Sequence, residues 1–217
     1  MGKLARPGPP TFKVERSLWR QGSGLVAGVD EVGRGPLAGP VAAGAVVLPP
    51  RARFPWLHCV RDSKQLGPTA REELAALIWR HALAAAVAFV PVWTIDRLGI
   101  AEAARLAMLQ AVGDLSRRPQ HLLIDAFRLP ACSLPQTPII EGDALSLSIA
   151  CASIIAKVAR DRVMEGEDAV FPGYAFADNK GYGTPFHLAA LDRLGPCDLH
   201  RRSFAPVREM LMVPAAV

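Results

Sequence analysis

The sequence predicts an α/β domain in which a central five-stranded mixed sheet is flanked by helices. Two observations lead to this prediction. Hydrophobic residues make up 51% of the 217 residues and charged residues only 21%, so the chain can bury a sizeable core and is not disordered as a whole. The apolar runs also have a characteristic order. Two runs that would form paired strands come first, and later runs that would form strands alternate with helical patterns.

The first two apolar runs cover residues 25–29 and 41–48, and a glycine- and proline-rich loop separates them. Such a pair is typical of neighbouring antiparallel strands. Strands are then expected over 87–93, 121–127 and 138–140, and helices over 68–81, 100–115, 146–164 and 186–194. Small residues at 150–153 should let the 146–164 helix approach the sheet closely. The last of these helices begins a C-terminal helical segment.

Residues 1–22 contain Pro7, Pro9 and Pro10 and are expected to be a flexible lead-in, with one folded domain over 23–217. An additional N-terminal domain is not expected before the first strand. The longest apolar run, 82–93, is too short to span a membrane, and the first twenty residues lack the apolar core of a secretory signal. A cytoplasmic location is therefore expected. The four cysteines, which lack zinc-ligand spacing, are expected to be reduced thiols: Cys59, Cys132, Cys151 and Cys197.

Several acidic residues follow apolar strands, where α/β sheets present ligands. Asp30 and Glu31 follow the first strand, Asp125 follows the fourth, and Asp143 comes just after the fifth. Alternatives remain for two of them, because Asp143 could cap a helix and Asp125 could be a solvated strand end. The adjacent Asp30 and Glu31 repel each other unless something neutralises them.

A divalent cation would neutralise all of these carboxylates together. Oxygen ligands without paired histidines or cysteines favour Mg²⁺ or Mn²⁺ over zinc. Four carboxylates carry enough charge for two ions, an arrangement that serves in-line displacement at phosphorus. The sequence therefore points to phosphodiester chemistry. The net charge of +5 favours a polyanionic partner only weakly.

Two glycine-rich segments could contact a ligand. Gly33, Arg34 and Gly35 form a loop directly after the first acidic pair, and Tyr182 lies between two glycines beside Lys180. Glycines let backbone N–H groups approach a ligand, and an exposed tyrosine can stack on a base or sugar. Both segments could also be plain turns, with the tyrosine ring covering the edge of the core.

The block from Gly28 to Val41, which reads GVDEVGRGPLAGPV, resembles the opening signature of the type 2 ribonucleases H, the bacterial ribonuclease HII family. Further blocks follow in the family's order, over 62–66, 124–125, 142–161, 179–187 and 200–204. The resemblance covers about residues 25–207. It implies the ribonuclease H-like fold, and a single catalytic domain over 23–217.

The resemblance also implies an activity and its residues. Such an enzyme cuts RNA in RNA–DNA hybrids and on the 5′ side of single ribonucleotides in duplex DNA, leaves 5′-phosphate and 3′-hydroxyl ends, and serves ribonucleotide excision repair. It acts as a monomer with two Mg²⁺ or Mn²⁺ ions. The residues carried over as catalytic and metal-binding are Asp30, Glu31, Asp125 and Asp143. Those carried over as substrate-binding are Gly33, Arg34, Gly35, Lys64, Lys180 and Tyr182.

Other cations are implied as phosphate contacts or braces of the acidic cluster: Lys157, Arg160 and Arg202. Lys157 and Arg160 could equally be surface partners of Asp161 on their helix. The sequence departs from the family at Glu141 and Leu145, where members often carry basic residues, so phosphate attraction there should be weaker. Two rival functions remain: a non-catalytic binding module, and another two-metal nuclease on the same fold.

Overall fold

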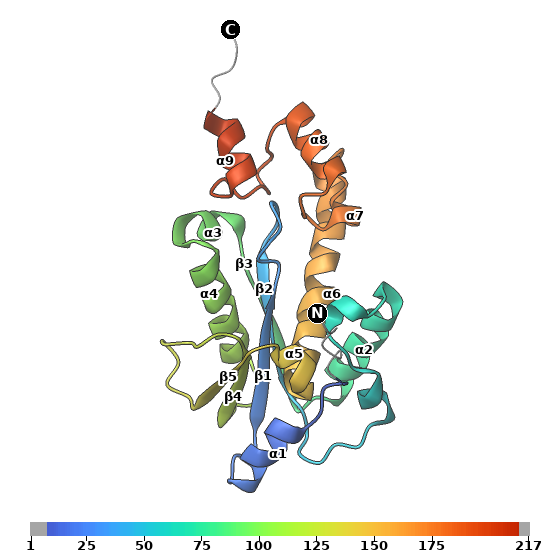
Figure 1. Ribbon diagram of the computed structural model, residues 1–217, viewed down its shortest axis with the longest axis vertical. Coiled ribbons are helices and arrows are strands. Elements are labelled where there is room, and N and C mark those ends of the chain that lie inside the picture. The colour runs from blue at the N-terminus through green and yellow to red at the C-terminus, as the bar shows by residue number, and fades with distance from the viewer. Residues whose placement is uncertain (1–7, 213–217) are drawn as a thin grey trace, which may run out of the picture.

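One mixed sheet forms the centre of the protein in the computed structural model, which describes residues 8–212 (Figure 1). The strands are β1 (Val26–Val32), β2 (Val41–Val47), β3 (Ala84–Val90), β4 (His121–Asp125) and β5 (Gln136–Ile139). They lie side by side in the order β3-β2-β1-β4-β5. The β1–β2 and β2–β3 pairs are antiparallel, and the β1–β4 and β4–β5 pairs are parallel. The predicted five-stranded mixed sheet flanked by helices is confirmed.

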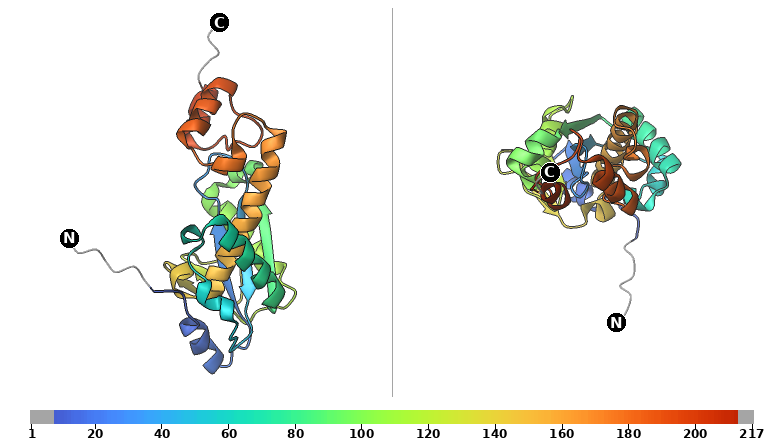
Figure 2. Two further views of the ribbon diagram at one scale, coloured as in Figure 1. Left: turned by 90° about the vertical axis from the view of Figure 1, so that its right-hand side faces the viewer. Right: turned by 90° about the horizontal axis from the view of Figure 1, so that it is seen from above.

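Helices cover both faces of this sheet, as the view from above shows (Figure 2). One face carries α2 (Pro68–His81) and α6 (Leu147–Val170), and the other carries α3 (Val92–Leu98) and α4 (Ile100–Gly113). A separate apolar cluster fills the space between the sheet and each pair of helices. The sheet is therefore buried between two helical layers, as in other α/β domains.

Helix α6 lies against the sheet at backbone distance. A Cβ atom on Gly28 of β1 would lie 2.0 Å from the Ser148 carbonyl carbon, and one on Gly44 of β2 would lie 2.3 Å from the Ala152 carbonyl oxygen. Glycine in the strands and small residues in the helix permit this approach. The expected close contact of the 150–153 segment is observed, although the helix continues to Val170, beyond the predicted end.

The third strand differs from its predicted range of 87–93. It covers Ala84–Val90, and α3 begins directly after Pro91. Proline has no N–H group to continue the ladder with β2, and its fixed φ suits the start of a helix. The apolar run therefore changes from strand to helix at Pro91.

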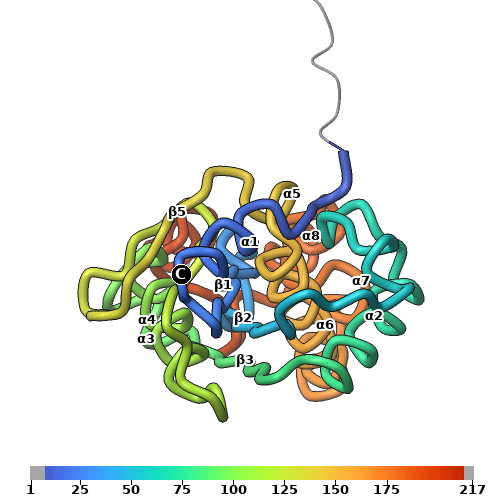
Figure 3. Tube along the Cα trace, turned by 90° about the horizontal axis from the view of Figure 1, so that it is seen from below, coloured from blue at the N-terminus to red at the C-terminus, as the bar shows by residue number. Residues whose placement is uncertain are grey.

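The predicted lead-in over 1–22 needs a correction, although residues 1–7 lie outside the described part of the chain. Helix α1 (Lys13–Arg20) packs beneath the sheet beside α5 (Gly142–Leu145), as the view from below shows (Figure 3). Glu15 is fully buried and accepts hydrogen bonds from the Ser146 hydroxyl (2.7 Å) and the Ser148 N–H (2.9 Å). Its carboxylate thus lies at the positive N-terminal end of α6, which anchors α1.

The C-terminal part forms a helical cap at one end of the molecule (Figure 1). It contains α7 (Phe176–Asn179), α8 (Pro185–Leu194) and α9 (Ala205–Met212). This is the predicted C-terminal helical segment. Two short 3₁₀ turns, η1 (Pro55–Cys59) and η2 (Ser63–Gln65), precede α2. Across residues 8–212, no helix is both long enough and apolar enough to cross a membrane.

Candidate active site

Parallel pairing of β1 with β4 brings three of the predicted carboxylates together. Val29 is the register partner of Ile124, and the acidic residues begin one position later on each strand. Asp30, Glu31 and Asp125 each have an oxygen within 4.8 Å of the others'. The carboxyl ends of two neighbouring strands therefore form one acidic cluster, as the sequence predicted.

Asp143 comes from α5 and lines the same cavity of about 230 Å³ as the other three carboxylates. The Gly142 N–H donates to Asp125 Oδ1 at 2.7 Å, which ties α5 to the end of β4. A Cβ atom on Gly142 would lie 2.7 Å from Ile149 Cδ1, so a larger residue there would require the Ile149 side chain to shift. The alternative of Asp143 as the cap of the long helix does not hold, because the Ser146 side chain caps α6.

Burial and mutual repulsion raise the pKa of each carboxyl group in the cluster. The pKa of Asp30 is raised well above its usual value by burial, and then by the charges of Glu31 and Asp125. Burial also raises the pKa of Glu31, against the opposing effect of Arg34. The pKa values of Asp125 and Asp143 are raised by burial as well. The cluster thus holds more negative charge than the protein neutralises.

The donor atoms fit hard divalent cations. All are carboxylate oxygens, the ligands that Mg²⁺ and Mn²⁺ prefer. Glu31 Oε2 is buried, yet it has no hydrogen-bond partner among residues 8–212. A buried carboxylate oxygen is normally hydrogen-bonded, so this orphan is explained by a ligand that the protein itself does not supply.

Lys64 supplies a cation beside the cluster. It lies in η2, where Asp62 Oδ1 accepts a hydrogen bond from the Lys64 N–H at 2.9 Å. Burial lowers the pKa of Lys64, but the nearby carboxylates, chiefly Asp62 and Asp143, outweigh it and keep the pKa above its usual value. The neighbouring Ser63 hydroxyl lies 3.0 Å from the Ser153 hydroxyl of α6, which fixes η2 against the site.

Buried Arg201 orients the loop that contains Gly33, Arg34 and Gly35. Its guanidinium donates to the carbonyl oxygens of Gly33 (2.6 Å), Arg34 (3.0 Å) and Gly39 (2.8 Å). In a trans peptide the C=O and N–H groups point in opposite directions. The N–H groups of Arg34 and Gly35 therefore point away from Arg201, and both residues line the cavity.

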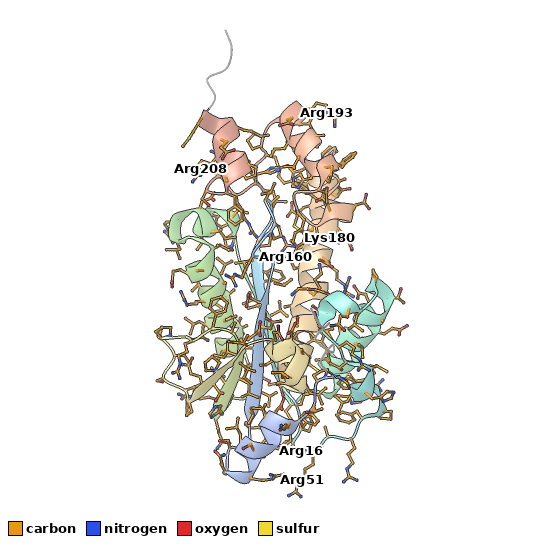
Figure 4. All side chains as sticks on the ribbon, viewed as in Figure 1. Arg16, Arg51, Arg160, Lys180, Arg193 and Arg208 are labelled. Carbon is orange, nitrogen blue, oxygen red and sulfur yellow. The ribbon has the colours of Figure 1, made fainter. Side chains whose placement is uncertain are left out.

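A second buried arginine supports the same loop from α6. Arg160 donates to the carbonyl oxygens of Pro40 (2.9 Å), Ala38 (3.2 Å) and Lys180 (3.0 Å). Its side chain extends from α6 to the loop between β1 and β2 (Figure 4). Arg160 is fully buried, so the alternative of a surface partner for Asp161 is wrong for this residue. For Lys157 that pairing is observed, with Nζ 2.7 Å from Asp161 Oδ1, and Lys157 also lines the cavity.

The other predicted substrate-binding residues differ in position. Tyr182 lines the cavity and is 41% exposed. The Arg34 guanidinium pairs with Glu31 (3.3 Å) and lies over the Phe127 ring. Lys180 does not line the cavity, because its ammonium pairs with Glu165 at 2.7 Å, near α7 (Figure 4). Arg202 is exposed and lies 3.9 Å from Asp198.

Sequence reasoning did not identify the roles of Arg201, Ser63 and Ser153. One signal was available for the similar case of Arg160, which follows Ala156 by four residues and precedes Met164 by four. That spacing places it on the apolar face of α6. No such periodicity marks Arg201, which lies in a loop between α8 and α9.

Known proteins are similar to this chain in sequence and in fold. The family model described as Ribonuclease HII matches residues 27–207. A ribonuclease HII of Dehalococcoides mccartyi is 52% identical over 94% of this chain and 97% of its own length, and one of Moorella thermoacetica is 56% identical over 88% and 91%. The crystal structure of ribonuclease H2 from Pyrococcus horikoshii superposes with a TM-score of 0.73 at 27% identity, covering 86% of this chain and 96% of that one.

The family match covers residues 27–207, and the structural match covers 86% of the chain. The predicted ribonuclease H-like fold is thereby confirmed. The chain belongs to the ribonuclease HII family and is a metal-dependent nuclease.

Proposed function

We propose that this enzyme hydrolyses the RNA strand of RNA–DNA hybrids and cuts on the 5′ side of single ribonucleotides embedded in duplex DNA, leaving 5′-phosphate and 3′-hydroxyl ends. One observation carries the proposal: the acidic cluster and the loop of Gly33, Arg34 and Gly35, whose carbonyls Arg201 holds, line the same cavity. The name of these relatives, ribonuclease HII, supports this substrate class. Because a single chain supplies all of these residues, the proposed active form is a monomer.

The carboxylates of Asp30, Glu31, Asp125 and Asp143 would hold two Mg²⁺ or Mn²⁺ ions. When bound, such ions neutralise the carboxylates, lower the pKa of an attacking water and stabilise the departing oxygen. The surrounding residues orient the carboxylates. Gly142 fixes the orientation of Asp125 through its N–H group, and Arg34 holds Glu31.

Recognition of the ribonucleotide is assigned to the loop of residues 33–35. The 2′-hydroxyl is the group that distinguishes RNA from DNA, and backbone N–H groups can donate to it. Buried Arg201 holds the loop carbonyls, so these donors are oriented before the substrate arrives. A preorganised donor loses little conformational entropy when it binds.

Tyr182 and the lysines would contact the rest of the duplex. The exposed Tyr182 ring can stack on the deoxynucleotide next to the ribonucleotide. Lys64, beside the carboxylates, would attract the scissile phosphate. Lys180 would contact a phosphate outside the cavity, where its ion pair with exposed Glu165 can be exchanged for a phosphate oxygen.

A labelled DNA duplex with one embedded ribonucleotide tests this proposal. In Mg²⁺ we expect a single cut on the 5′ side of the ribonucleotide, no cut in the matching all-DNA duplex, and no cut with chelator. Asp30→Asn should lower the cleavage rate by at least about a thousandfold, because it removes a charge from the cluster. Asp192→Asn, on the exposed surface of α8, is the matched control and should cleave normally. Cleavage by Asp30→Asn at the control rate would refute the site.

A further inference from the structure

Two histidines outside the cavity form a buried pair in the helical cap. His187 lies in the first turn of α8, and His200 lies in the loop before α9. Both are almost completely inaccessible to solvent, at 0% and 1% exposure. The rings of Tyr174 and Phe176 pack around them. Each ring nitrogen of a buried histidine in apolar surroundings needs a hydrogen-bond partner. The partners of His187 and His200 determine which nitrogens donate and which accept.

The hydrogen bonds at the two ends of the pair fix the tautomer of each ring. The Tyr182 carbonyl oxygen can only accept, so His187 Nδ1, 2.9 Å away, must carry a proton. The Cys197 backbone N–H can only donate, so His200 Nδ1, 3.0 Å away, must be unprotonated. The two Nε2 atoms are 3.1 Å apart. For two neutral rings, only a bond from His200 Nε2–H to His187 Nε2 completes the chain.

The resulting chain runs in one direction, from the Cys197 N–H through His200 and His187 to the Tyr182 carbonyl. An additional proton on either ring would place two donors face to face. Burial accordingly lowers the pKa of His187, and burial with the neighbouring His187 lowers that of His200 to about 4. Both rings are therefore neutral near pH 7.

The chain of hydrogen bonds ends at Tyr182, the aromatic residue that lines the cavity among the described residues of the cap. The backbone of the Tyr182 turn is held from the opposite side as well, because the Gly181 carbonyl accepts the Leu37 N–H at 2.8 Å. The ring itself stays accessible, and its edge lies 3.9 Å from where a Gly35 Cβ would be. The backbone is thus fixed while the stacking face is left free.

We propose that His187 and His200 are positioning residues that hold the Tyr182 ring in its substrate-contacting orientation. The inference rests on the proposed function, in which Tyr182 stacks on a nucleotide. It assigns the histidines to substrate binding and not to the chemical step, since neither touches the carboxylate cluster.

Kinetics on the single-ribonucleotide duplex test the inference. His187→Phe keeps a ring but removes the donor to the Tyr182 carbonyl, and it should raise KM about five- to tenfold with kcat changed less than about twofold, as expected for a weakened stacking contact. His187→Asn, whose amide N–H can replace Nδ1–H, should restore most of the lost KM. Exposed His58→Asn is the control and should match the wild type.

A double-mutant cycle with Tyr182→Ala separates positioning from general stability. If the histidine acts through the tyrosine, His187→Phe should change KM less than about twofold in the Tyr182→Ala background. Additive effects, or a fall in kcat with KM unchanged, would overturn the inference. If instead the wild type does not cleave the duplex, or Asp30→Asn cleaves normally, it is the proposed function that fails.

A spectroscopic readout remains decisive if His187→Phe does not fold. Long-range ¹H–¹⁵N NMR spectra of the wild type at pH 7 should show His187 protonated at Nδ1 and His200 at Nε2. The opposite tautomers, or a charged ring at either position, would contradict the chain.

Discussion

Asp30 is the most buried of the four carboxylates, at 5% exposure, and burial and its acidic neighbours raise its pKa. A carboxyl group whose pKa is higher in the folded than in the unfolded state stabilises the fold at low pH, and this contribution is lost as pH rises through the folded pKa. At neutral pH, without metal, an ionised Asp30 is therefore a source of instability. The cluster trades stability for the ability to bind cations.

Asp30→Asn should consequently stabilise the metal-free protein while abolishing cleavage. We expect the free energy of unfolding at pH 8 in EDTA to rise by about 1–2 kcal/mol, because the substitution removes a buried charge without changing the side-chain volume. Urea denaturation followed by circular dichroism measures it. The surface variant Asp192→Asn should change it by less than about 0.5 kcal/mol. A destabilised Asp30→Asn protein would show that the carboxylate is already neutralised within the fold.

The contact between α6 and the sheet governs stability at the scale of elements. Asp143 and Ser153 both depend on where α6 lies, and α6 can lie there because Gly28 and Gly44 have no side chains. If a side chain separated α6 from β1, Ser153 of α6 would lie further from Ser63 and Asp30. The site thus depends on close packing of two backbones.

Gly28→Ala should therefore be strongly destabilising. Its Cβ would lie 2.0 Å from the Ser148 backbone, so helix or strand must shift, at a cost of about 3 kcal/mol or more. Gly166→Ala, in α6 itself, is the matched control, because its Cβ would meet nothing within 4 Å. That variant should gain about 0.5–1 kcal/mol from helix propensity. Thermal unfolding of both variants is the measurement, and equal shifts in Tm would contradict the packing argument.

For the molecule as a whole, local patterns in the sequence were enough to predict the sheet and its acidic edge. Apolar runs mark strands, and the carboxyl ends of β1 and β4 meet because parallel neighbours end at the same edge. The end of β3 was misplaced because both sides of Pro91 are apolar, and periodicity cannot separate a strand from a short helix in such a run.

The features that the sequence could not predict depend on contacts between distant residues. Arg201 donates a hydrogen bond to the Gly33 carbonyl, 168 positions away in the sequence. No local pattern predicts that an arginine in a loop will be buried. Glu15 lay in a segment that its prolines and charges marked as flexible, yet its carboxylate caps a helix 133 positions later. The motif that contains Lys180 predicts a contact with the substrate, but it does not predict that the Lys180 ammonium pairs with Glu165.

Binding of Mn²⁺ tests the central claim most directly, namely that strand-end carboxylates hold the catalytic cations. Free Mn²⁺ measured by electron paramagnetic resonance, after subtraction of the Mn²⁺ that the duplex alone binds, gives the number of ions bound to the enzyme in the presence of the uncleaved all-DNA duplex. We expect two ions per chain in the wild type, at least about tenfold weaker binding in Asp125→Asn, and cleavage of the ribonucleotide-containing duplex that follows Mn²⁺ occupancy. Wild-type Mn²⁺ affinity in Asp125→Asn, or cleavage that persists in EDTA, would contradict the account.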